Sequence, residues 1–280
     1  MSKQKPRFVF WGTPRFAVNV LNALEAHGLL PTLIIASPDR PRGRGLEVTP
    51  SLAKAWGEER GIDVLAPEKI KDEEFIQELQ NTDWDVFVVA AYAKLIPKTI
   101  LDIPRRGCLN VHPSLLPKFR GPSPAVSAIL ADARTTGVSI MLMNEKMDEG
   151  PVVAQGRVEL DAEDWPPKGS VFEDLLATEG GNLLAETLEH WIAGDVEPEA
   201  QNNDEATYTK KFSDADSLID LAGDPHHELL KIRAFDKNPR AHFFDVDGKR
   251  IIITEAEVAD GKLQILKVIP EGKKEQAYKQ

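Results

Sequence analysis

Cysteine is almost absent from this chain of 280 residues, because Cys108 is the only one. An internal disulfide is therefore impossible, and such sparing use of cysteine is typical of a reducing compartment, so we expect a cytoplasmic protein. Cys108 lies in an apolar segment, which favours a small core side chain over a nucleophile. Clusters of Cys and His at metal-ligand spacing are also absent, so we expect no metal site.

Long hydrophobic runs and an excess of positive charge are missing as well. The longest apolar runs, such as residues 86–91, are far too short to span a bilayer, and residues 1–7 contain no signal-peptide core. The net charge of −11 argues against a general nucleic-acid coat protein. Residues 207–280 are neutral, with 13 basic and 13 acidic side chains, which is only weak evidence for RNA contact. We expect neither a membrane nor DNA as a partner. We also expect the protein to be a monomer.

The first half of the chain alternates strand-like apolar runs with helix-like segments. This alternation predicts an α/β fold, with a Rossmann-like, mostly parallel sheet covered by helices on both faces. The ligand crevice of such a sheet lies beyond the carboxyl ends of its strands. The turns that fall at such ends are residues 12–14, 91–92 and 112–114. The strand patterns are at residues 8–11, 33–36, 63–65, 85–89 and 108–111, and the helical patterns at 18–24 and 51–61.

The turn at Gly12-Thr13-Pro14 has a second interpretation as a nucleotide-binding turn. It lacks the second and third glycines of the G-x-G-x-x-G pattern, and no acidic residue closes the next strand in the expected way. The sequence has no Walker motif either. A dinucleotide site is therefore not expected.

The second half of the chain changes in texture twice. Residues 152–160 indicate a strand pair or one bent strand, and 170–193 a long helix that Gly180-Gly181 weakens in its middle. Short alternating segments and Asp-Gly turns after Thr207 indicate a small β domain. The predicted domains are a catalytic domain at 1–193, a polar linker at 194–206 and a C-terminal β domain at 207–280.

Polar side chains at the end of the strand pattern 108–111 are the candidates for chemistry. Asn110 and His112 are two residues apart, so on a strand they point to the same face. An amide that holds a developing oxyanion, a titratable ring and an acid such as Asp148 together suit acyl-type transfer. The same spacing also fits a purely structural Asn and His pair, and Asp148 alone also fits a solvated acid beside Glu145 and Glu149.

Four motifs stand out in the sequence. Two of them surround the candidate residues above: Asn110-x-His112-x-Ser114-Leu115-Leu116-Pro117-x-x-Arg120-Gly121-x-x-Pro124 and Asp148-x-Gly150. Two lie nearer the start of the chain: Phe10-x-Gly12-Thr13-Pro14-x-Phe16-Ala17 and Pro38-Asp39-Arg40-Pro41-x-Gly43-Arg44-Gly45. The first two closely resemble motifs of the folate-dependent formyltransferases, and the other two are similar to those of the methionyl-tRNA formyltransferase branch of that family. The resemblance covers nearly the whole chain, from about residue 7 to 274, and implies transfer of a formyl group from 10-formyltetrahydrofolate to the α-amine of initiator methionyl-tRNA, through a tetrahedral intermediate, for translation initiation.

The resemblance also assigns roles to individual residues. Asn110 would hold the formyl oxygen, and His112 would stabilise the tetrahedral species as a charged or proton-donating ring. Asp148 would orient His112, raise the pKa of its ring and take the amine proton. Folate would contact a loop of Ser114, Leu115, Leu116 and Pro117 and a wall formed by Ala91, Tyr92 and residues 95–97. Initiator tRNA would contact Arg40, Arg42 and Arg44, which lie in a loop rich in proline and glycine.

The C-terminal part departs from the family pattern. The resemblance implies a barrel-like (OB-like), tRNA-contacting domain, but a hairpin's worth of residues is missing between Ile251 and Lys262. Residues 236–239 also stand where the family usually has Pro-Trp-Pro. We therefore predict a shortened domain. Two alternatives use the same donor, a formyltransferase acting on amino-sugar nucleotides and, less favoured because no N-terminal regulatory domain precedes the first strand, a hydrolase that releases formate.

Overall fold

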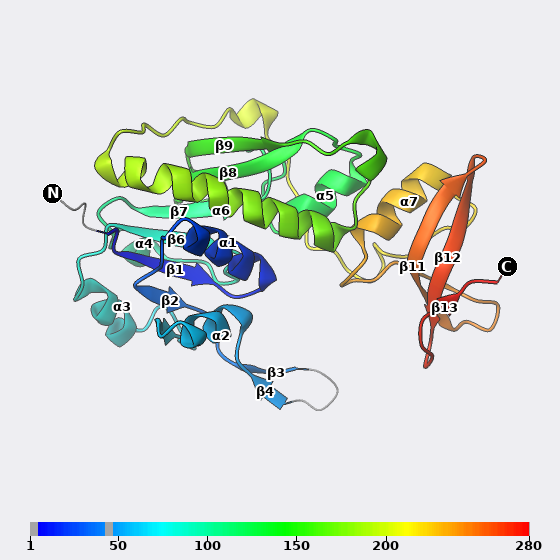
Figure 1. The fold of residues 1–280 in the computed structure, drawn as a ribbon, viewed down its shortest axis with the longest axis horizontal. Coiled ribbons are helices and arrows are strands. Elements are labelled where there is room, and N and C mark those ends of the chain that lie inside the picture. Colours follow the sequence, from blue (N-terminus) through cyan, green and yellow to red (C-terminus); the bar gives the residue numbers. More distant parts are fainter. Residues whose placement is uncertain (1–4, 43–46, 280) are drawn as a thin grey trace. The chain divides into compact units, whose positions relative to one another are not determined.

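The structure, a computed structural model, describes residues 5–42 and 47–279 (Figure 1). The strands of its main sheet are β1 (Phe8–Gly12), β2 (Leu33–Ile35), β5 (Asp63–Leu65), β6 (Val86–Ala90), β7 (Cys108–His112), β8 (Thr136–Leu142) and β9 (Val152–Val158). Their order across the sheet is β5-β2-β1-β6-β7-β8-β9. The strands from β5 to β7 in this order are parallel, and β8 runs antiparallel to β7. The predicted α/β fold with a mostly parallel sheet is confirmed.

Helices cover both faces of this sheet, and each face has its own hydrophobic core. Strand β1 contributes to both cores because its side chains alternate. Phe8 and Phe10 belong to one buried cluster, whereas Val9 and Trp11 belong to the other. The helices of the first cluster are α1 (Arg15–Ala26), α2 (Leu52–Glu59) and α6 (Gly169–Ala193), and those of the second are α3 (Glu73–Gln80) and α4 (Lys98–Leu101).

Parallel pairing brings the ends of three strands to one edge of the sheet. Strand β6 lies between β1 and β7 and pairs in parallel with both. The turns at residues 12–14, 91–92 and 112–114 follow these strands directly, so they share that edge as predicted. Strand β8 is not among the predicted strands, and its antiparallel pairing places Ser139 opposite His112. Residues 152–158 form one strand, β9, rather than a strand pair.

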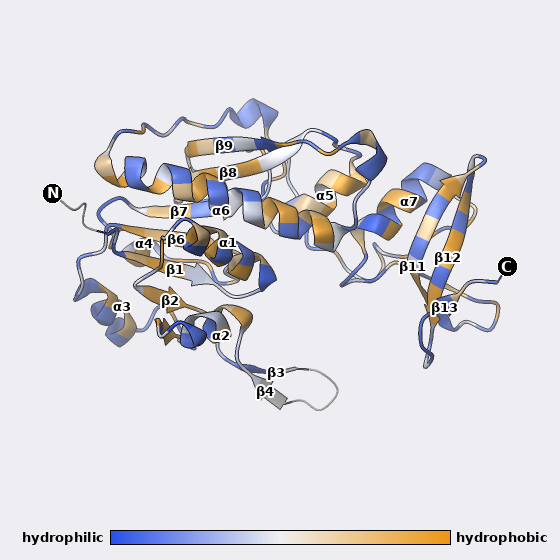
Figure 2. Cartoon of the chain, viewed as in Figure 1, coloured by the Kyte–Doolittle hydropathy of each residue, from blue (hydrophilic) through white to orange (hydrophobic). Residues whose placement is uncertain are grey.

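Two adjacent glycines lie in the middle of α6, where the sequence predicts a weak point. The helix nevertheless runs unbroken, with hydrophobic and hydrophilic patches mixed along it (Figure 2). A Cβ atom on Gly180 would lie 2.5 Å from Val111 Cγ1. A Cβ atom on Gly181 would lie 2.6 Å from Ala23 Cβ and 2.9 Å from the backbone oxygen of Val20. The glycines therefore allow α6 to approach β7 and α1 closely.

This packing predicts the opposite of the usual effect of alanine in a helix. Alanine normally stabilises a helix interior over glycine by roughly 0.5–1 kcal/mol. We expect Gly181→Ala to lower the free energy of unfolding by about 1–3 kcal/mol, because its methyl group meets the backbone of α1. Urea unfolding measures the change. Thr178→Ala, at an exposed position of the same helix, should change it by less than about 0.5 kcal/mol. Equal stability of Gly181→Ala and the wild type would contradict the close approach.

The C-terminal residues form a small antiparallel sheet, as predicted. The turn at Asp260-Gly261 has positive φ angles of 52° and 70°, which is the conformation that Asp-Gly favours between paired strands. The strand before this turn runs from Arg250 to Ala259. Ile232 and Ile253 lie in the hydrophobic core of this sheet. The strands of this sheet are β10 (His242–Phe244), β11 (Arg250–Ala259), β12 (Lys262–Pro270) and β13 (Gln276–Ala277), in the order β10-β11-β12-β13. Helix α7 (Pro225–Ala234) precedes them, and helix α5 (Pro124–Leu130) lies earlier in the chain, between β7 and β8.

The chain forms two compact units, and their bounds differ from those of the predicted domains. The first unit holds the residues up to Arg120, Gly137–Val158 and Asp174–Thr207, and the second holds Gly121–Thr136, Glu159–Glu173 and the residues from Tyr208 onward. The predicted linker, 194–206, thus falls within the first unit. Its Glu199 exchanges two backbone hydrogen bonds of 2.7 Å with Val152, so this polar segment is packed against the sheet rather than free. The domain boundaries themselves stay a prediction.

The remaining elements are short. Two 3₁₀ helices are η1 (Ala162–Asp164) and η2 (Asn203–Glu205), and a two-stranded antiparallel sheet consists of β3 (Arg40–Arg42) and β4 (Glu47–Thr49). Within the described part of the chain, no helix is both long and apolar enough to cross a membrane.

Candidate active site

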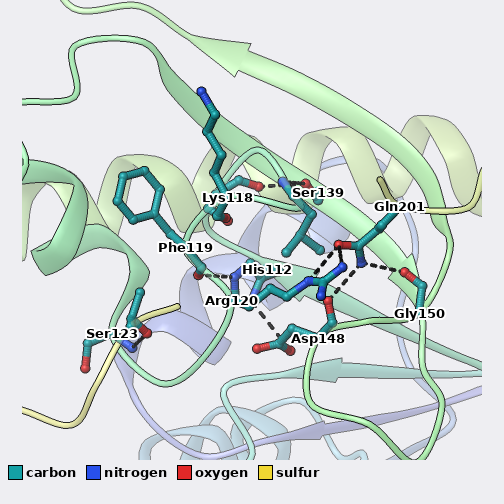
Figure 3. Close-up of polar contacts among 12 residues, drawn as sticks. His112, Lys118, Phe119, Arg120, Ser123, Ser139, Asp148, Gly150 and Gln201 are labelled. Carbon is teal, nitrogen blue, oxygen red and sulfur yellow. Dashed lines mark hydrogen bonds and ion pairs between the residues drawn. The ribbon is translucent and has the colours of Figure 1, made fainter. Parts of the chain in front are cut away.

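His112 ends strand β7 and lies between two oxygen atoms. Its Nε2 atom is 3.0 Å from the backbone oxygen of Phe119, and its Nδ1 atom is 3.8 Å from Asp148 Oδ1 (Figure 3). The side chain of His112 is only 5% exposed. The structure therefore brings His112 and Asp148 together, although 3.8 Å is too long for a hydrogen bond. The contact that holds the ring is the Phe119 carbonyl, which the sequence did not indicate.

Burial decides the charge of this ring. Burial lowers the pKa of His112 more than Asp148 and the Phe119 carbonyl raise it. Asp148 does raise the pKa of the ring, as expected, but burial outweighs this effect, because a sequence shows the neighbouring acid and not the desolvation. A carbonyl oxygen can only accept, so Nε2 carries the proton of the neutral ring. The lone pair of Nδ1 then faces Asp148.

Asn110 lies two residues before His112 on strand β7. It is half-buried in β7 and is paired in register with Val89 of β6 and Met141 of β8. Asn110 and His112 share a face of the strand, as the spacing predicts. Among the described residues, its side-chain amide makes no hydrogen bond. Its two N–H donors are therefore available to a ligand at the sheet edge.

The predicted folate loop is held by hydrogen bonds from three polar side chains, Ser114, Ser139 and Gln155. Ser114 Oγ donates to the backbone oxygen of Lys118 at 2.6 Å. Ser139 Oγ donates to the Ser114 oxygen at 2.6 Å and accepts from the Leu116 nitrogen at 3.0 Å. Gln155 donates to the Leu116 oxygen at 2.8 Å. Ser114 and Leu116 are buried, so within this loop Leu115 and Pro117, which are half-buried, are the better candidates for ligand contact.

The second predicted folate segment carries groups that fit an aromatic, polar-edged ligand. Ala91 is exposed, with a left-handed φ of 50°, and Leu95 is 73% exposed although it is a large apolar side chain. The Tyr92 ring packs edge-on against Trp11 at 5.3 Å. Burial raises the pKa of Tyr92 to about 12, so its phenol stays neutral. Within the described chain the buried Tyr92 hydroxyl has no hydrogen-bond partner.

A buried arginine beside the site was not predicted to have a role. Arg120 is 0% exposed. Its Nε and Nη2 atoms donate to Gln201 Oε1 at 3.0 and 2.8 Å, and Nη2 also donates to Asn203 Oδ1 at 2.8 Å (Figure 3). Glu149 Oε1 lies 3.9 Å from Nη1. Arg120 belongs to the family motif in the sequence analysis. Gln201 lies in the predicted linker, and its polar side chain was the only signal in the sequence for a role at this site.

Two residues that contact the ring have an uncommon backbone conformation. Phe119 has a φ of 59° and Asp148 a φ of 53°, in the left-handed region that costs a residue with a side chain roughly 1–3 kcal/mol. Such conformations persist where surrounding contacts fix them. The site therefore depends on hydrogen bonds that hold these two backbones.

Two of the predicted tRNA-binding arginines, Arg40 and Arg42, lie in strand β3. Strands β3 and β4 pair Arg40 with Thr49 and Arg42 with Glu47. Arg40 is exposed, and Arg44 lies outside the described residues. Just before β3, Asp39 accepts a 2.6 Å hydrogen bond from Lys54 and raises its pKa. The role of these arginines stays a prediction.

Comparison with known proteins supports the motifs quoted above. The formyl transferase family model matches residues 6–186. A methionyl-tRNA formyltransferase of Lachnospira eligens is 39% identical over 254 residues, which cover 91% of this chain and 79% of that protein. The methionyl-tRNA formyltransferase of Bacillus subtilis is 38% identical over 236 residues, covering 84% of this chain and 74% of that protein.

Solved structures share the fold. A methionyl-tRNA formyltransferase from Clostridium thermocellum superposes with a TM-score of 0.63 at 15% identity, covering 95% of this chain and 98% of that one. A sugar N-formyltransferase from Shewanella sp. superposes with a TM-score of 0.67 at 18% identity, covering 91% and 99%. At these identities the likeness concerns the fold alone, so it does not separate the two activities. The family model shows the formyl transferase family, and the relatives near 38% identity show the branch: the chain belongs to the methionyl-tRNA formyltransferases of that family.

Proposed function

We propose that the chain transfers a formyl group from 10-formyltetrahydrofolate to the α-amine of initiator methionyl-tRNA, in the cytoplasm. The observation that carries this proposal is the arrangement of His112 between Asp148 and the Phe119 carbonyl. Asn110, whose amide binds no other described residue, lies on the same strand face. This arrangement occurs in a chain that is 36–39% identical to methionyl-tRNA formyltransferases.

The reaction breaks the bond between the formyl carbon and the folate nitrogen and forms one to the amine. Folate supplies the formyl group in an activated form. Asn110 would donate N–H hydrogen bonds to the formyl oxygen as negative charge develops on it, because its donors have no other partner among the described residues. An amine of pKa about 8 needs only modest help to lose its proton.

His112 and Asp148 would manage the proton together. The neutral ring and the carboxylate accept the proton that the amine loses, directly or through water. When the ring is protonated, both its N–H groups face oxygen atoms, Phe119 O and Asp148 Oδ1. These two acceptors stabilise the imidazolium beside the oxyanion. The proton then moves to the departing folate nitrogen, so His112 is charged during the reaction and neutral at rest.

The folate-binding residues support the proposal through their unused groups. Ala91 and Leu95 expose apolar surface after β6, and Tyr92 has a buried hydroxyl without a partner in the described chain. A pterin ring has an apolar face and a polar edge, so both features fit it. Ser114, Leu116 and Pro117 would shape the loop and Leu115 would contact the ligand.

The C-terminal antiparallel sheet is the proposed second tRNA contact. We assign its four-stranded sheet to a shortened OB-like domain. Its neutral charge makes a weak electrostatic site, so Arg40, Arg42 and Arg44 would carry more of the tRNA affinity. The matched region spans about four fifths of the length of these curated relatives.

One experiment decides among the candidate reactions. The protein is incubated with 10-formyltetrahydrofolate and either charged initiator tRNA, amino-sugar nucleotides or no acceptor. We expect formylmethionyl-tRNA to form at least about a hundredfold faster than any other product. Formylation of a sugar amine alone, or release of formate at the same rate without an acceptor, would replace the proposal with one of the two alternatives.

Arg44 gives a second test of the tRNA substrate. We expect Arg44→Ala to raise the KM for tRNA about tenfold and to leave donor binding unchanged. The salt dependence of tRNA use should flatten by roughly one unit in a double-logarithmic plot, because one phosphate contact is lost. Arg157→Ala, which removes the same charge from an exposed site on β9, is the control. Equal tRNA affinity of Arg44→Ala and the wild type would exclude this residue as a tRNA contact.

A further inference from the structure

The segment of residues 201–207, called the clamp segment below, contacts the backbone on both sides of the His112 ring. On the Asp148 side, Gln201 Nε2 donates to the backbone oxygen of Asp148 at 2.8 Å and to that of Gly150 at 2.6 Å (Figure 3). These bonds hold the turn in which Asp148 has its left-handed conformation. Gln201 therefore fixes the position of the carboxylate without touching it.

On the Phe119 side, the contacts come from Thr207 at the other end of the clamp segment. Thr207 Oγ1 accepts from the Phe119 nitrogen at 2.8 Å. The Thr207 backbone oxygen accepts from the Arg120 nitrogen at 2.9 Å, and its nitrogen donates to the Pro117 oxygen at 3.3 Å. These bonds hold the second left-handed residue, Phe119, whose oxygen faces His112 Nε2.

Arg120 links the two ends of the clamp segment. Its backbone nitrogen binds Thr207, and its buried guanidinium donates to Gln201 and Asn203. One side chain thus connects the Phe119 turn to the glutamine that holds the Asp148 turn. A displacement of the Phe119 turn would therefore displace the Asp148 turn as well.

We propose that the clamp segment sets the geometry of the proton-handling pair, with Gln201 and Thr207 as positioning residues for Asp148 and for the carbonyl that orients His112. This proposal rests on the proposed function for its kinetic test. A misplacement of about 1 Å in a catalytic group can cost a hundredfold in rate, so small movements of these turns matter for turnover more than for binding.

The test uses a substitution that keeps the size of Gln201, removes its N–H donors and adds a negative charge, which the control variant below also adds. Gln201→Glu keeps an oxygen for Arg120 but cannot donate to the carbonyls of Asp148 and Gly150. We expect kcat to fall about tenfold or more, while the KM values for donor and tRNA stay within about twofold. Gln77→Glu makes the same amide-to-acid change at an exposed position of α3, outside the clamp segment, and should leave kcat within about twofold.

A double-mutant cycle separates positioning from general structural damage. If Gln201 acts through Asp148, Gln201→Glu should lower kcat by less than about twofold when Asp148→Asn is already present. An effect of the same size in both backgrounds, an unchanged kcat in the single variant, or a loss expressed in KM alone would overturn the proposal.

Thr207 provides an independent test that does not need activity. Thr207→Val keeps the shape of the side chain but loses the acceptor for the Phe119 nitrogen, whereas Thr207→Ser keeps it. We expect the imidazole N–H proton of His112, followed by NMR, to exchange with solvent at least about tenfold faster in Thr207→Val and at the wild-type rate in Thr207→Ser. Equal exchange in all three proteins would overturn the proposal. A wild type that formylates no methionyl-tRNA would refute the proposed function but leave this exchange test intact.

Discussion

Alanine in place of Asn110 is expected to lower kcat for formyl transfer by at least about a hundredfold. Loss of one donor to a developing oxyanion typically costs a factor of about 10²–10³. The half-buried Asn110 makes no hydrogen bond to another described residue, so its removal breaks none within that part of the protein. Single-turnover kinetics with saturating donor and methionyl-tRNA measure the effect, and thermal unfolding should show a midpoint close to that of the wild type.

The isosteric variant Asn110→Asp is the matched control for packing. A carboxylate keeps the size of the side chain but has no N–H donor and repels an oxyanion. We expect it to be at least as slow as the alanine variant. If the aspartate protein turned over at a rate near that of the wild type, oxyanion stabilisation by Asn110 would be excluded.

The parts of the site that follow from strand geometry were predictable from the sequence. Asn110 and His112 share a face because strand side chains alternate, and the carboxyl ends of parallel strands meet at one edge. Asp148 was found through the family motif. Gln201 was not predicted, because it contacts Asp148 across 53 residues of chain and lies in a segment whose composition suggests a linker.

Burial is the physical term that the sequence could not supply. The acid beside His112 was foreseen, but the desolvation that lowers the pKa of the ring depends on packing around it. Gly180 and Gly181 show the same limit, since their helix propensity predicts a weak point and their contacts show a close approach. In the C-terminal sheet, by contrast, the local Asp260-Gly261 turn was predictable because two adjacent residues determine it.

Replacing Asp148 with asparagine tests the proton pathway with little change in structure. Gln201 binds the backbone oxygen of residue 148, not its side chain, and asparagine tolerates a φ of 53° well. Donor binding should therefore be retained. We expect kcat to fall about a hundredfold, because an amide cannot take the proton that the amine loses. Glu145→Gln, at an exposed acid nearby, should stay within about twofold.

The pH dependence of the Asp148→Asn variant gives the sign of the coupling. The Asp148 carboxylate raises the pKa of His112, while burial lowers it. Without the carboxylate, the pKa of His112 falls further, so the ring stays neutral to a lower pH. The acidic limb of the pH–kcat profile, where His112 becomes protonated at rest, should therefore move to lower pH in the variant. A limb that moves to higher pH, or a kcat near that of the wild type, would show that Asp148 does not act on His112.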